Sequence, residues 1–237
     1  MCIKIIKMPV MRQLLLSLLM LLSIHLSAQF GFSGGYLSGE AENWTASPGL
    51  ISGTSVDLPG TGWQVGIDYW LRLKNYRVEF LPTLAYSQQE SNLQSDISNQ
   101  FSGAHLFIHT NIYPFDFKGD CDCPTFSKEG PSFEKGLFIQ ISPGISQLNY
   151  EYQHSFYQDS PATSSETAFS IGAGLGLDLG ISDLLTITPV VSLRYYPSVN
   201  WEILSGTDDV PFLSPIQAES TLIQYQAGLR LGIRLDQ

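Results

Sequence analysis

Two cysteines provide the most unusual chemical feature of the sequence, in a short acidic segment at residues 118–124. Two neighbouring thiols can bind a soft metal, form a strained redox-active disulfide, or lie in a loop that docks a partner. A structural zinc site needs four ligands, and only two soft ones are present here. We therefore expect no metal and no cofactor. Cys121 and Cys123 remain a candidate loop site, either as a locally ordered turn or as a docking point.

His105 and His109 are the next candidates, because residues four apart on a strand share one face. At about 3.3 Å per residue they lie about 13 Å apart, which is too far for one shared metal ion. The sequence holds no nucleophile elbow, no glycine-rich phosphate loop and no pair of catalytic carboxylates. We predict no catalytic residue and no enzymatic activity.

Eight segments must position these side chains, and each alternates apolar with small or polar residues. Successive strand side chains point to opposite faces, so every segment has one apolar face. The clearest case is the last, where Ile223, Tyr225 and Leu229 alternate with Gln224, Gln226 and Arg230. The predicted strands are 29–37, 63–73, 76–88, 100–113, 135–152, 166–180, 185–195 and 221–235. The fifth changes phase near Ser146-Gln147, which indicates a bulge.

The connections between these segments alternate in length. Short turns are expected at Lys74-Asn75 and Ile181-Ser182-Asp183, and long polar loops at 38–62, 89–99, 153–165 and 198–220. Short turns on one side and long loops on the other are typical of a transmembrane barrel in the bacterial outer membrane. We predict an all-β protein, an eight-stranded antiparallel up-and-down transmembrane β-barrel. Its connection at 114–134 is long, although it lies on the short-turn side.

Residues 1–28 have the layout of a signal peptide. Basic residues come first, an apolar run follows, and Ser27-Ala28 supplies the small residues of a cleavage site. The expected domains are therefore the signal peptide at 1–28 and the barrel at 29–237. The mature chain would carry 9 Lys and Arg against 22 Asp and Glu, a formal net charge of −13. Such a charge disfavours nucleic acid as a partner.

Charged residues of the barrel collect on the faces that we assign to its interior, in the periplasmic half. Buried charges need partners, and an eight-stranded barrel has room only for its own side chains or one small ligand. We expect a hydrogen-bonded plug; the alternative is a narrow or gated anion path. The predicted lumen charge network is Asp68, Arg72, Arg77, Glu79, Asp178, Arg230 and Arg234.

Three features give the chain a family resemblance: the leader ending Leu26-Ser27-Ala28-Gln29, the eight amphipathic strands, and the closing strand 225–234. On these features it resembles the small outer-membrane β-barrel proteins of Gram-negative bacteria, the OmpA-like and PorT-like barrels. The resemblance implies a location in the cell outer membrane, in contact with its lipid, and a structural, binding or envelope-assembly (secretion-associated) role.

Two other functions stay open at this point. A porin-like narrow pore for small solutes is the first alternative, and a barrel enzyme acting on lipid or peptide is less favoured. Within the structural reading, residues 114–134 would bind a periplasmic or envelope protein. The sequence leaves the oligomeric state open.

Overall fold

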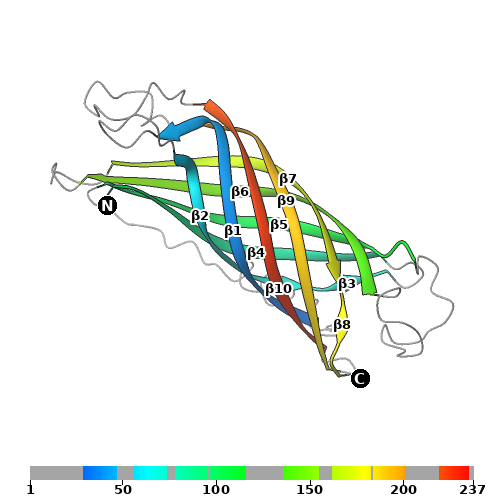
Figure 1. Cartoon of the computed structure of the whole chain (residues 1–237). Coiled ribbons are helices and arrows are strands. Elements are labelled where there is room, and N and C mark those ends of the chain that lie inside the picture. Colours follow the sequence, from blue (N-terminus) through cyan, green and yellow to red (C-terminus); the bar gives the residue numbers. More distant parts are fainter. Residues whose placement is uncertain are drawn as a thin grey trace, which may run out of the picture.

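Long strands with alternating side chains form a closed barrel in the computed structural model of the chain (Figure 1). The structure describes residues 29–46, 56–73, 78–94, 97–115, 136–154, 162–182, 184–200 and 219–234. The proposed signal peptide, Arg77, and the loop that contains Cys121 and Cys123 lie outside these residues. Within the described ranges, no helix is long and apolar enough to cross a membrane.

Ten strand segments make eight staves, a stave being one continuous strand of the barrel. The segments are β1 (Gln29–Ala46), β2 (Val56–Tyr69), β3 (Leu71–Arg72), β4 (Val78–Gln94), β5 (Ile97–Ile112), β6 (Leu137–His154), β7 (Ala162–Leu177), β8 (Leu179–Gly180), β9 (Leu185–Asn200) and β10 (Glu219–Arg234). The short β3 and β8 continue β2 and β7 beyond one-residue interruptions at Trp70 and Asp178.

Every stave pairs antiparallel with its neighbours in the chain, and β10 pairs with both β9 and β1, which closes the barrel. The predicted fold class is therefore confirmed. The turn at Ile181-Ser182 is also confirmed, since both backbone amides donate to the carbonyl of Leu185, at 2.9 and 3.2 Å.

The half of the barrel that carries the short turns is called the lower barrel here. Its outer surface is apolar on all eight staves. Large side chains point outward and are exposed there, one from each stave being Phe32, Ile67, Leu84, Leu106, Ile141, Ile171, Val191 and Leu229. On β7 the apolar row runs from Phe169 to Leu177. At about 3.3 Å per residue and a tilt of about 40°, this row is about 23 Å high, the height of the apolar band of membrane barrels. The chain is thus a transmembrane barrel of the outer-membrane type.

Aromatic side chains mark the upper edge of the apolar belt. Tyr36, Trp63, Tyr86, Phe169 and Tyr195 are the last large outward residues on their staves, Tyr225 lies one outward position below Ile223 on β10, and all six rings are exposed. Aromatic girdles of this kind lie at the membrane–water interface. We call the strand ends above this girdle the outer collar.

The polarity of the barrel wall reverses in the outer collar. Outward residues become polar, as at Glu40, Glu90 and Asn149, while many inward residues become apolar and lie beside buried polar side chains such as Gln89 and Gln224. Ten inward residues form one buried cluster, which we call the apolar plug: Ala41, Trp44, Leu58, Phe101, Leu148, Tyr150, Ala168, Tyr196, Val199 and Leu222. Above the membrane the barrel therefore packs like a water-soluble one.

Two predictions from the sequence are corrected by this reversal. The bulge near Ser146-Gln147 is wrong: β6 keeps one register with β5 and with β7, and Leu148 and Tyr150 simply point inward. The loops at 38–62, 89–99, 153–165 and 198–220 are also too long. The strands continue into all four of them, because in water a polar outward row is as suitable for a strand as an apolar one is in lipid.

Candidate functional site

The lower lumen is built around one ion pair that spans three staves. Arg230 on β10 and Asp68 on β2 meet across β1, with Nε–Oδ2 at 2.8 Å and Nη2–Oδ1 at 2.6 Å. Gly31 of β1 lies beneath them, and a Cβ there would meet the carboxylate and lie 2.5 Å from Arg230 Nη2. The Arg230 guanidinium also faces the ring of Trp70, with Cζ 5.7 Å from the centroid.

Tyr113 gathers the other two carboxylates of the lower lumen. Its hydroxyl donates to Glu79 Oε2 at 2.8 Å and also contacts Asp178 Oδ2, while the Thr188 hydroxyl donates to Asp178 Oδ1. The sequence analysis placed Tyr113 only at the end of a strand. Its odd position, shared with His105 and His109, was the signal that would have placed it in the lumen.

Four of the seven predicted network residues are therefore described, and all four lie in the lumen: Asp68, Glu79, Asp178 and Arg230. Arg72 and Arg234 belong to β3 and β10, but their side chains lie outside the described part of the structure, as does all of Arg77.

Arg194 of β9 is the centre of the middle lumen, a role that the sequence analysis did not assign to it. Its guanidinium donates to the Ser142 carbonyl at 3.1 Å, to the Ser142 hydroxyl at 2.6 Å and to the Ser170 hydroxyl at 3.0 Å. Its Cζ lies 3.5 Å from the centroid of the Phe107 ring. Neutral oxygens and a π face thus hold this cation within the described lumen.

His105 and Ser87 have the contact of a nucleophile–base pair, but not the rest of a catalytic arrangement. The Nε2 of His105 lies 2.8 Å from Ser87 Oγ, but its Nδ1 lies 2.8 Å from Ser146 Oγ rather than from an orienting carboxylate. Ser87 is completely buried and His105 is 3 % exposed. Since the apolar plug lies above them, a substrate has no open route from the outside, and the group joins neighbouring staves.

A small polar cavity lies between the ion pair and the middle layer. Its volume is about 60 Å³, and its lining includes Asp68, His109, Gln140, Ser192 and Arg230. His109 Nδ1 is buried and has no hydrogen-bond partner among the described protein atoms. At about 30 Å³ per water molecule, the cavity has room for about two waters, which would satisfy such a nitrogen. Among the described residues, no three metal-binding side chains come together.

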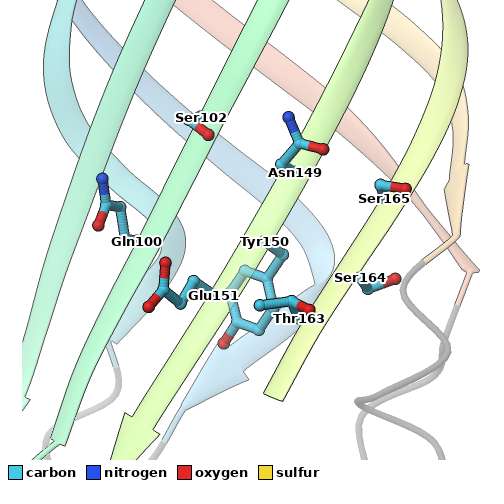
Figure 2. Close-up of a pocket in the computed structure, with 8 residues that line it drawn as sticks. All are labelled: Gln100, Ser102, Asn149, Tyr150, Glu151, Thr163, Ser164 and Ser165. Atoms are coloured by element: carbon cyan, nitrogen blue, oxygen red, sulfur yellow. The ribbon is translucent and has the colours of Figure 1, made fainter. Parts of the chain in front are cut away.

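A second hollow lies on the outside of the barrel, in the outer collar. This collar recess has a volume of about 310 Å³ and lies over β5, β6 and β7 (Figure 2). Six polar side chains of the outward rows line it, together with Tyr150 and Ser164: Gln100, Ser102, Asn149, Glu151, Thr163 and Ser165. The strand pairing sets them in two rows, Ser102–Asn149–Ser165 and Gln100–Glu151–Thr163. The sequence analysis missed this site, because it assigned part of the segment to loops.

Comparison with solved structures finds bacterial outer-membrane barrels. Ail of Yersinia pestis, solved in complex with the heparin analogue sucrose octasulfate, is 12% identical, covers 87% of this chain and 99% of its own, and gives a TM-score of 0.47. Neisserial surface protein A is 9% identical, covering 87% and 97%, with a TM-score of 0.45. The outer membrane protease OmpT of Escherichia coli is 7% identical, covering 88% and 96%, with a TM-score of 0.42. No protein-family model matches the chain. No curated protein matches it either.

Proposed function

We propose that the protein is a closed, non-conducting outer-membrane barrel that acts as a structural and binding component of the envelope. The apolar plug is the observation that carries this proposal. Trp44, Leu58, Phe101, Leu148 and Tyr196 are each at most 1 % exposed, and they fill the outer half of the barrel. An ion or small solute crossing this plug would leave water for an apolar interior, which is strongly unfavourable.

Packing of the lower lumen supports the same conclusion. Phe138 is completely buried opposite Gly176, where an added Cβ would clash with the Phe138 ring. Phe107 is also completely buried, beneath the Arg194 guanidinium. Charged side chains in this region pair with side chains on other staves, as Asp68 does with Arg230, and do not line an open path. A narrow pore is therefore the less favoured function.

Single-channel recording in planar bilayers tests this proposal. We expect the full chain to insert without producing steady open channels. A matched variant with Trp44→Ala and Tyr150→Ala removes two aromatic side chains from the plug and keeps the lower network. If that variant conducts ions, the apolar plug is the part of the barrel that blocks ion flow. Steady open channels from the unaltered protein would overturn the closed barrel in favour of the pore.

A closed lumen leaves the two ends and the outer collar as the surfaces for binding. On the periplasmic side, we propose that residues 114–134 bind a periplasmic or envelope protein, as expected of an envelope-assembly component. Support for this step comes from the sequence, where an unusually long connection carries Cys121 and Cys123 on the short-turn side. Site-specific crosslinking in intact cells from these two cysteines tests it. The same crosslinker at exposed position Ser198 of the outer collar is the control.

An enzyme is the least supported class. The Ser87–His105 contact is the strongest catalytic geometry in the described lumen, and it is buried with a serine on its far side. We expect Ser87→Ala to change the stability of the barrel and to leave any envelope phenotype of the folded protein intact. Loss of a lipid- or peptide-cleaving activity in this variant at wild-type folded yield would overturn that view.

A further inference from the structure

In the described structure, the six outward side chains of the collar recess are a contiguous group without hydrogen-bond partners. Several other outward polar side chains of the collar pair with one another: Gln147 with Thr167 at 2.6 Å, Gln88 with Glu90 at 3.0 Å, Ser198 with Glu219 at 2.8 Å, and Tyr225 with Glu40 at 2.8 Å. Within the described structure, none of the six recess side chains makes a side-chain hydrogen bond. Their donors and acceptors are therefore available to a ligand.

The recess also lies above two neighbouring staves that carry no aromatic residue in the girdle. On β5 and β6 the last apolar outward residues are Ala104 and Ile145, five of the other staves end the belt with an aromatic ring, and β10 carries Tyr225 just below Ile223. Small and aliphatic side chains let a lipid approach the barrel wall more closely than a ring would. On β5, the recess residue Ser102 thus follows directly on the small apolar residue Ala104 in the outward row.

The height of the recess places it at the level of the lipid head groups. Ser102 is two residues above Ala104 on β5, a vertical rise of about 5 Å at a strand tilt of about 40°. The polar head-group layer of a bilayer extends about 5–8 Å beyond the hydrocarbon core on each side. The lower row of the recess, Ser102–Asn149–Ser165, therefore faces lipid head groups. The upper row, Gln100–Glu151–Thr163, faces the parts of large head groups that project further into the water.

The chemistry of the lining selects among head groups. Gln100 and Asn149 each carry one amide donor group and one acceptor, the three serine and threonine hydroxyls do both, and the Glu151 carboxylate accepts. This set matches the neighbouring hydroxyls of a sugar. No cation is among the lining residues, and Glu151 would repel a bare phosphate. Figure 2 shows these side chains spread across the three staves.

We propose that the collar recess binds the sugar head group of an outer-leaflet glycolipid, with the acyl chains lying against β5 and β6 below the recess. This inference deepens the binding role under the proposed function and rests on it. It does not depend on the closed lumen, so bilayer conductance would overturn the closed barrel while leaving the binding of glycolipid intact.

Lipid enrichment around the full-length protein tests the proposal. The barrel is reconstituted in vesicles of phosphatidylglycerol with a minor fraction of monoglucosyl diacylglycerol, extracted gently, and its retained lipids are counted by mass spectrometry. We expect the glycolipid to be enriched over its bulk fraction, and Asn149→Ala with Gln100→Ala to reduce this enrichment about tenfold. Ser198→Ala with Glu219→Gln, a self-paired and exposed site of the outer collar on β9 and β10, is the control and should leave enrichment unchanged.

Several results would overturn the proposal. Equal enrichment in the recess and control variants would show that the recess does not bind the sugar, and a preference for phosphatidylglycerol would show that the head-group chemistry is wrong. Loss of enrichment on adding a chelator would indicate a bridging metal ion instead. Full competition by soluble glucose would show that the lipid chains contribute nothing. Since all four replaced residues point outward, heat-shifted migration in detergent gels confirms that each variant is folded.

Discussion

Replacing Asp68 by asparagine removes one charge from the lower lumen and leaves the shape of the side chain. Its carboxylate accepts two hydrogen bonds from Arg230, and the two side chains are only 3 % and 12 % exposed. Removing one partner of a buried ion pair typically costs about 3–5 kcal/mol, because the other charge is left buried and uncompensated. Since the neighbouring polar cavity can supply water to Arg230, we expect a loss near the lower limit, about 3 kcal/mol.

A double-mutant cycle separates the pair from general damage to the lumen. Arg230→Met alone should also be costly, because it leaves the Asp68 carboxylate buried. The double variant, Asp68→Asn with Arg230→Met, leaves no unpaired charge at this point, so we expect it to lose less than the sum of the two single variants. The coupling free energy should reach about 2 kcal/mol, within the range found for residues in direct contact.

Equilibrium urea unfolding in lipid vesicles, followed by tryptophan fluorescence, measures these free energies. Glu90→Gln is the matched control, since it changes the same chemical group on the exposed collar and should shift the free energy of unfolding by at most about 0.5 kcal/mol. If Asp68→Asn is as mild as this control, or if the cycle shows no coupling, the ion pair is not an element of barrel stability.

Three further predictions concern other parts of the barrel wall. Gly31→Ala should lower the free energy of unfolding by about 1–3 kcal/mol, because the added methyl group displaces the ion pair. Gly34 lies on the open outward face, so Gly34→Ala should be neutral or stabilising by up to about 1 kcal/mol in the same urea unfolding assay. Leu229→Arg at the middle of the apolar belt should lower the free energy of unfolding in vesicles by about 2–4 kcal/mol. Gln147→Arg in the outer collar should lower it by only about 0–1 kcal/mol. Equal losses would refute the assignment of Leu229 to the lipid-facing surface. Burial raises the pKa of Glu166 at the outer rim, so protonation favours the folded state and stability should increase as the pH falls from neutral through this raised pKa. Glu166→Gln should remove that part of the gain in a pH series of unfolding curves.

Strand pairing order and the lumen-facing rows of the lower barrel could be predicted from the sequence, because alternation and lipid exposure act together there. Val65, Ile67 and Leu71 face lipid while Gln64 and Asp68 face the lumen, as their spacing predicts. Each lipid-facing position must be apolar, so the pattern identifies both the strand and the side.

The outer half of the barrel could not be predicted in the same way. Alternation indicates that Leu148 and Tyr150 share a face, but it does not indicate which face is inside. The answer depends on the solvent outside the wall, which changes from hydrocarbon to water at the girdle. A sequence rule that assumes lipid throughout therefore interprets inward apolar residues as a change of phase. The collar recess was not predicted for a related reason, since Thr163 and Ser165 fall in a polar segment that reads as a loop, whereas the strand continues through it above the girdle.

The reversal of polarity along the wall also limits what the protein can do. The lower lumen holds paired charges, and the outer half holds the apolar plug together with buried amides such as Gln89 and Gln224, so an ion suited to the lower layer meets an apolar cluster above it. Strands of 16 to 18 residues in β1, β5, β6, β7, β9 and β10 are longer than the 9 to 11 residues that a membrane requires. The additional length supports a rigid collar in water rather than a wider pore. Under the proposed function, a barrel with such a collar and a sealed interior has its binding surfaces on the outside, and we propose that the side chains of the recess meet the head groups of the membrane there.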